Sequence, residues 1–208
     1  MPFDFLKKNK PPAEEPAPPP AADIPTVTAK GMTFDGLTEE WRLVGAMQLD
    51  GRLSDVLNRR ESIPITDVSW APIDGSEPFS PAPGLKAIDP YDLIVVLAGQ
   101  TTLPIMNEDE KAAHRIHKIS YDLALDVPPF RVVGTVFLFP GSEPERLLDR
   151  ATEMFVPVTD AVAYLGDQRI GGTEVDTFLV NRSYLRGVEQ VDRRARGEQS
   201  RDGRQPGG

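Results

Sequence analysis

The chain has 208 residues, and its 32 Asp and Glu outnumber its 23 Lys and Arg, giving a formal net charge of −9. This charge argues against DNA or RNA as a main partner, because binding a polyanion needs cations that neutralise its phosphates. The chain has no Cys, which excludes disulfides, thiolate metal sites and Cys catalysis. No apolar run reaches the roughly 18–20 residues of a spanning helix, and the first residues lack a signal-peptide pattern. We therefore expect a cytoplasmic protein without stable membrane insertion.

Both ends of the chain have compositions typical of segments that do not pack. Residues 11–25 hold seven Pro with Ala and Glu, and proline fixes φ and lacks an N–H, so an extended, polyproline-like stretch is expected. Residues 192–208 are rich in Arg, Gly and polar side chains, with too little apolar surface to offset chain entropy. We expect disordered tails over 1–25 and 192–208.

An internal duplication is the most informative feature of the remaining sequence. Five blocks recur in the same order: 33–35 with 120–122, 41–49 with 130–138, 57–59 with 148–150, 63–68 with 156–161, and 92–96 with 176–180. We therefore predict two tandem copies, residues 26–106 and 119–191, joined by a polar connector over residues 107–118.

Each copy has the pattern β-β-α-β-β, which predicts an α+β, mainly β fold with the copies related by a pseudo-twofold axis. Apolar residues alternate in 41–49 and 130–138, as in half-buried strands. Gly45 and Gly134 fall on the core face of these strands, where a missing side chain lets another group approach. A helix of about nine residues is expected after Gly51 in the first copy and from Ser142 in the second.

The next strand of each copy begins with a proline-containing block that ends in Thr-Asp, at Asp67 and Asp160. Side chains of this type bond nearby backbone groups and favour bends. We interpret the two Asp as bend formers rather than as a catalytic carboxylate pair.

Residues 178–188 have the pattern strand, tight turn, strand, which resembles the last part of Sm-like barrels. The acidic body of the chain argues against the RNA chemistry of that family.

Residues 52–58, Arg-Leu-Ser-Asp-Val-Leu-Asn, followed by Ile-Pro-Ile-Thr-Asp-Val at 63–68, resemble a small β-rich domain of uncharacterised bacterial proteins. That domain carries an Arg-Leu-Ser-Asp-x-Leu-Asn helix and then a Leu/Pro-Leu-Thr-Asp-Ala strand. The resemblance covers part of the first copy and, more weakly, residues 159–161 of the second, whose helix region departs from the motif. It implies a duplicated fold and carries no known activity with it.

No nucleophile motif and no phosphate-cradling motif is present, so no catalytic residue and no cofactor is predicted. His114 and His117 stand at i and i+3 beside acidic residues, but a metal site would need a third well-placed ligand, and we favour a solvated connector. Anion or nucleotide binding in a groove between the copies remains open, with the candidate residues Arg59, Arg60, Arg131 and Arg150.

Partner contacts are the other open possibility. Phe137 and Phe139 lie on the outward face of their strand, where a loop, the other copy or another subunit covers them. Phe3, Phe5 and Leu6 precede the Pro-rich stretch and either dock on a partner or an anionic membrane surface or form a frayed end. We expect a non-enzymatic scaffold, adaptor or assembly subunit whose partner is another protein or a second copy of this chain. The alternative is a small-ligand sensor or an enzyme of unrecognised type.

Overall fold

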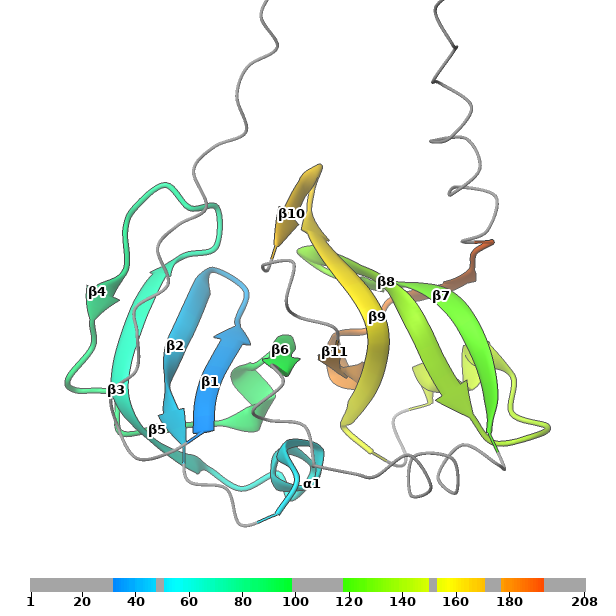
Figure 1. Ribbon diagram of the computed structural model, residues 1–208, viewed down its shortest axis with the longest axis horizontal. Coiled ribbons are helices and arrows are strands. Elements are labelled where there is room, and N and C mark those ends of the chain that lie inside the picture. The colour runs from blue at the N-terminus through cyan, green and yellow to red at the C-terminus, as the bar shows by residue number, and fades with distance from the viewer. Residues whose placement is uncertain (1–31, 48–50, 99–117, 150–152, 171–176, 193–208) are drawn as a thin grey trace, which may run out of the picture.

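The computed structural model describes residues 32–47, 51–98, 118–149, 153–170 and 177–192 (Figure 1). The elements of the first half are β1 (Met32–Leu37), β2 (Trp41–Met47), α1 (Leu53–Asn58), β3 (Ile63–Pro72), β4 (Ser80–Pro81), β5 (Ala87–Ile88), η1 (Pro90–Asp92) and β6 (Val95–Ala98). Those of the second half are β7 (Ile119–Val127), β8 (Phe130–Leu138), η2 (Pro144–Leu148), β9 (Phe155–Leu165), β10 (Gln168–Ile170), β11 (Thr177–Asn181), η3 (Arg182–Tyr184) and β12 (Gly187–Gln190).

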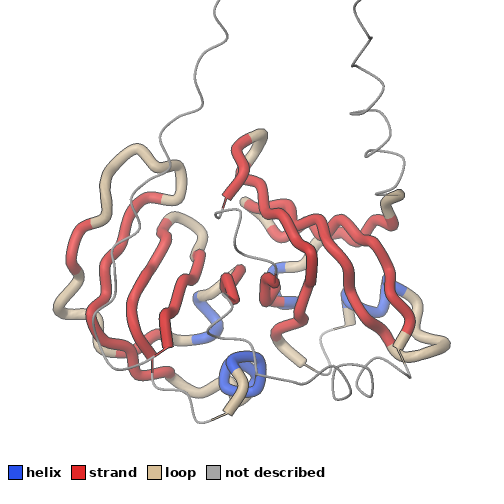
Figure 2. Tube along the Cα trace, viewed as in Figure 1, coloured by secondary structure: helices blue, strands red, loops and turns tan. Residues whose placement is uncertain are grey.

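The expectation of a mainly β protein is confirmed. The strands form one continuous sheet in the order β12-β7-β8-β9-β11-β6-β1-β2-β3-β4, with β10 added to β9 and β5 added to β3. Neighbouring strands in the first half and in the second half run antiparallel, as do β6 and β11 between them. The sheet curls into two groups of strands, and Figure 2 shows the one α-helix of the described residues at the base between them.

The two halves share their central strands. β6 pairs with β11 over four residues, Ala98 with Thr177 through Val95 with Val180. Side chains of β6 alternate between two hydrophobic cores, because Val95 and Leu97 pack with the second half and Val96 and Ala98 with the first. The described residues therefore form a single body rather than two separate domains.

A bulge of the same form occurs in each half. Between the pairs of Val44 with Ser69 and Ala46 with Thr66, two residues of β3 face the single Gly45 of β2. The same two-to-one arrangement places Asp160 and its neighbour opposite Gly134. Asp67 and Asp160 have φ values of 51° and 47°, in the left-handed region that Asp adopts more readily than most residues. The predicted bends at both Asp are thus confirmed.

The glycine opposite each bulge is required by packing. A Cβ added to Gly134 would lie 2.6 Å from Val158 Cγ1, 2.8 Å from Ala161 Cβ and 2.9 Å from the Thr159 carbonyl oxygen. A Cβ added to Gly45 would lie 2.9 Å from the Thr66 carbonyl oxygen. Both glycines therefore lie on the core face, as the sequence predicts.

The helix predicted for the second half is absent, and a five-residue 3₁₀ turn, η2, takes its place. Pro144 stands in its first turn, and Glu143 rather than Ser142 occupies the N-cap position, without a side-chain cap. The guanidinium of Arg182 binds the carbonyls of Arg146 and Leu147, which a longer α-helix would use for its own hydrogen bonds. Only α1 is an α-helix in the described ranges, and it has six residues rather than nine.

The predicted tails over 1–25 and most of 192–208, and the connector except Lys118, lie outside the described residues. The predicted strand–turn–strand at 178–188 is confirmed as β11, η3 and β12. None of the helices in the described part of the chain has the length and apolar character that crossing a bilayer requires.

Candidate functional site

The predicted site residues Arg59 and Arg60 end helix α1. Arg59 is the C-cap residue, and its backbone N–H donates to the carbonyls of Asp55 and Val56. Arg60 has a φ of 61°, the left-handed conformation that commonly terminates helices. Both side chains are exposed, so they add positive charge at the end of the helix where the dipole favours it.

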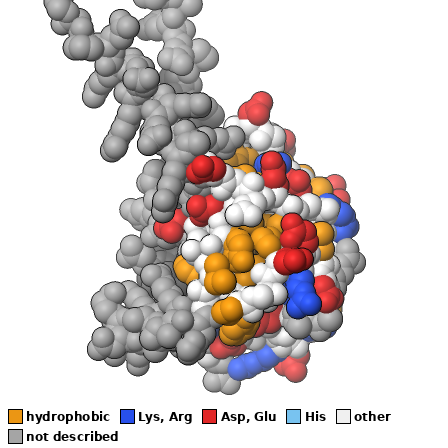
Figure 3. Space-filling model, turned by 90° about the vertical axis from the view of Figure 1, so that its right-hand side faces the viewer, with side chains coloured by type: hydrophobic (Ala, Val, Ile, Leu, Met, Phe, Trp, Pro, Cys, Tyr) orange, Lys and Arg blue, Asp and Glu red, His pale blue; other side chains and the backbone are white. Residues whose placement is uncertain are grey.

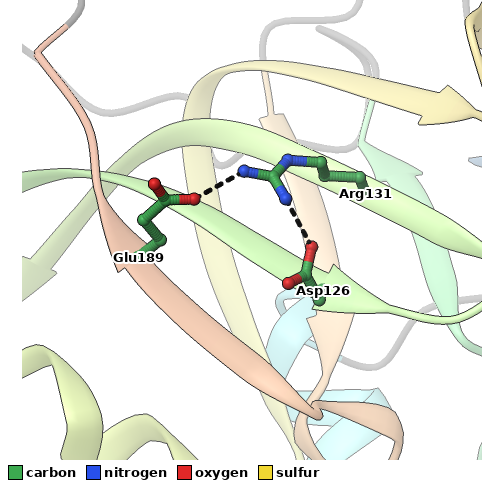
Figure 4. Close-up of polar contacts among 3 residues, drawn as sticks. All are labelled: Asp126, Arg131 and Glu189. Carbon is green, nitrogen blue, oxygen red and sulfur yellow. Dashed lines mark hydrogen bonds and ion pairs between the residues drawn. The ribbon is translucent and has the colours of Figure 1, made fainter.

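Arg131, at the start of β8, belongs to an ion-pair network on the second half (Figure 4). Its guanidinium donates to Asp126 at 3.0 Å and to Glu189 at 2.7 Å, which joins β8 to β7 and β12. The hydrogen bond to Glu189 raises the pKa of Arg131. All three side chains are about half exposed or more, so the network adds little stability, and an anion would have to compete with two carboxylates for Arg131.

The predicted arginines do not lie at one place in the fold. Helix α1 contacts β9 at Phe155, whereas Arg131 faces Tyr164 near the other end of β9. Nine residues separate these two points, which corresponds to roughly 30 Å of extended strand. Arg150 lies outside the described residues.

The outward side of β8 carries the other predicted residues. Phe137 is half-buried, and Phe139, just after the strand, is 63% exposed with Lys118 Nζ 5.1 Å from its ring centroid. Val133 lies on the same side as Phe137, opposite Val162 of β9. We call Val133, Phe137, Phe139 and Val162 the outer apolar surface. Figure 3 views the second half from outside and shows hydrophobic side chains grouped between acidic and basic ones.

A stacked tryptophan pair was not anticipated from the sequence. Trp41 and Trp70 stack with ring centroids 4.7 Å apart, and Trp70 is 40% exposed. These are the only two Trp of the chain. In the block alignment of the sequence, the positions of Trp41 and Trp70 correspond to Phe130 and Ala163, and alternation alone gave no signal that the two indoles would stack.

Two buried polar residues at the end of β11 were also missed. Asn181 is fully buried and donates to the carbonyls of Leu93 and Pro90. Arg182 is 8% exposed and donates to the carbonyls of Arg146, Leu147, Asp149 and Glu153. Burial lowers the pKa of Arg182. Since every one of these acceptors is a backbone carbonyl, both side chains tie loops to the sheet, and neither is available to a ligand.

No group of three or more His, Asp or Glu that could hold a metal ion occurs in the part of the chain that the structure describes. His114 and His117 lie outside it, as do Phe3, Phe5 and Leu6. A scan against protein-family models found no match for this sequence, and searches among curated proteins and among solved structures found none either.

Proposed function

We propose that this protein is a non-enzymatic protein–protein interaction module, a scaffold, adaptor or assembly subunit, built from two copies of one β-rich unit. The observation that supports this function most directly is the exposure of the outer apolar surface, where Phe139 is 63% exposed beside the half-buried Phe137. Aromatic side chains exposed in this way are costly to leave in water and frequent at the centres of protein interfaces.

The matched bulges support the two-copy part of the proposal, because Gly45 and Asp67 correspond to Gly134 and Asp160 in the alignment of the blocks. The pairing of β6 with β11 gives independent support for the two copies. In the same alignment Val95 corresponds to Leu179 and Val96 to Val180. Val95 pairs with Val180 and Val96 with Leu179, so exchanging the halves maps the pairing onto itself.

The charges around the outer apolar surface fit a protein partner. Lys118 lies over the ring of Phe139, and Arg131, Asp126 and Glu189 stand at the opposite end of β8. An apolar centre with a charged rim is the usual composition of protein interfaces. The rim contains both signs of charge, which suits another protein better than a polyanion.

The experiment is a quantitative affinity capture with the full chain and the variant Phe139→Glu. Tyr91→Glu is the matched control, because Tyr91 is also aromatic and 47% exposed but lies on η1 of the first half. We expect a defined set of proteins to fall by about tenfold or more with Phe139→Glu, the loss typical of removing an interface anchor, and to persist with Tyr91→Glu. Equal recovery with both variants would contradict the proposed interface.

Sedimentation of the same proteins tests whether the partner is a second copy of this chain. A dimer that dissociates with Phe139→Glu but not with Tyr91→Glu would identify self-association through the outer apolar surface. A wild-type protein that sediments as a monomer at all concentrations would restrict the partner to another protein.

A further inference from the structure

The Trp41–Trp70 pair lies on the inner side of the sheet, at an end that the first core does not cover. Trp70 faces Leu43 across β2 and β3, and Trp41 stands two residues before Leu43, so all three point to the same side. Leu43 is 5% exposed and belongs to the core, whereas Trp70 is 40% exposed. The rings thus continue the core face into solvent.

In the second half, the sheet surface that corresponds to the tryptophan pair is buried. There the counterparts of Trp41 and Trp70 are Phe130 and Ala163, which are 3% and 0% exposed. Strand β10 pairs with β9 so that Ile170, 8% exposed, faces Ala163. In the first half β4 pairs with β3 at the same position, but the residue facing Trp70 is the exposed Ser80. A short serine in place of a buried isoleucine leaves the first half with an uncovered aromatic surface.

The two indoles offer the groups that recognise a polyproline II helix. Such helices have no internal hydrogen bonds, so their carbonyls are available, and their proline rings pack on flat aromatic surfaces. Within the described ranges neither Trp41 nor Trp70 donates a hydrogen bond from its indole N–H. The pair therefore presents a ring face together with unused donors.

We propose that the Trp41–Trp70 pair binds this chain's own Pro-rich segment, residues 11–25, in polyproline II conformation, with residues 16–20 on the rings. Residues 16–20 read Pro-Ala-Pro-Pro-Pro and carry no charge. At ~3.1 Å per residue they span ~15 Å, about one and a half turns, which suits a site made of two stacked rings.

The connecting chain is long enough for this contact. Met32 begins β1 opposite Met47, and six residues of β2, roughly 20 Å, separate Met47 from Trp41. Twelve residues join Pro20 to Met32 and reach ~40 Å when extended. Because the segment is tethered, its effective concentration is on the order of 1 mM, so a free-peptide Kd of about 0.1 mM leaves about nine-tenths of the sites occupied.

The test uses tryptophan fluorescence, since both tryptophans of the chain are in the site and selective excitation of tryptophan keeps the four tyrosines out of the signal. Acrylamide quenching is compared between the full wild-type chain, the full chain with P16A, P18A, P19A and P20A, and a control with P11A and P12A outside the contact. We expect quenching to rise about twofold in the first variant, because an occupied site becomes largely empty, and to stay unchanged in the control. A peptide of residues 11–25 at millimolar concentration should restore protection.

Circular dichroism should show the same folded spectrum for all three proteins, because the substitutions lie before β1. Equal quenching of the wild type and the first variant would overturn the proposal. Protection of the wild type that disappears on dilution would also overturn it, because the occupant would then be the Pro-rich segment of a second copy.

Discussion

The side-chain amide of Asn58 forms two hydrogen bonds with the backbone of Phe155, 97 positions further along the chain. Its Nδ2 donates to the Phe155 carbonyl at 3.3 Å, and its Oδ1 accepts from the Phe155 N–H at 2.8 Å. Asn58 is the last residue of α1, and Phe155 begins β9 in the other half. A six-residue helix is not stable alone, so this contact and the burial of Leu53 and Leu57 hold it in place.

Replacing Asn58 with Ala should therefore lower the free energy of unfolding by about 1–3 kcal/mol, because two backbone groups of Phe155 lose their partner. Ser54→Ala on the same helix is the control, since the hydroxyl of Ser54 donates a long 3.5 Å hydrogen bond to the neighbouring Asp55, and its loss should change stability by less than about 0.5 kcal/mol. Urea denaturation measures both values. Equal effects of the two substitutions would show that the contact between the halves contributes nothing to stability.

Gly134→Ala should destabilise the protein by about 1–3 kcal/mol, because the added methyl overlaps Val158, Ala161 and the Thr159 carbonyl. Gly45→Ala should cost less, since only the Thr66 carbonyl oxygen comes closer than 3 Å. Gly84→Ala is the control, with no atom within 4 Å of the added methyl. Thermal denaturation of the three variants gives the order, and a Gly134→Ala protein as stable as Gly84→Ala would argue against close packing at the bulge.

The bulge residues Asp67 and Asp160 should respond in parallel to substitution. Valine strongly disfavours a φ near 50°, so Asp67→Val and Asp160→Val should each cost about 1–3 kcal/mol. Asn adopts this conformation as readily as Asp, so Asp67→Asn and Asp160→Asn should be close to neutral. If chemical denaturation showed the Val variants to be as stable as the Asn variants, the left-handed backbone conformation would not determine which residues these two positions accept.

The strands were predictable because their side chains alternate. The expected strand at 130–138 has the observed bounds of β8; alternation placed Gly45 and Gly134 on the core face, and residue type and recurrence identified Asp67 and Asp160 as bend formers. Alternation over 41–49 puts Trp41 on the same face as Gly45, but it does not tell how far the core extends along a strand. The exposure of Trp70 depends on Ser80, which pairs with it from a strand of only two residues.

Long-range relations were not predictable. The apolar run of β6 indicates burial on both faces but not which partner lies on each side, and the pairing with β11 joins segments about eighty residues apart in sequence. The helix expected from Ser142 does not form, because the carbonyls of Arg146 and Leu147 accept hydrogen bonds from Arg182, a residue far along the chain. The candidate arginines were grouped by residue type, whereas their separation along β9 is a property of the folded sheet.

Stability at alkaline pH should depend on Tyr184. Its hydroxyl donates to the Tyr91 carbonyl at 3.0 Å, and burial, with the charges of Asp92 and Glu39, raises its pKa. A raised pKa in the folded state means that the native protein holds this proton longer, so the contribution is complete below about pH 10 and is lost as the pH rises through the folded-state pKa. Tyr184→Phe should remove this part of the pH dependence; identical alkaline profiles for the two proteins in urea denaturation would contradict it.

The most direct test that the two halves form a single body is the urea unfolding of Gly134→Ala followed by two probes. Both tryptophans lie in the first half, whereas Gly134 lies in the second, and far-UV circular dichroism reports on the whole sheet. Shared cores and the β6–β11 ribbon predict that the substitution lowers the tryptophan midpoint and the dichroism midpoint by the same amount. A tryptophan transition that stays at the wild-type midpoint while the dichroism splits into two steps would contradict it.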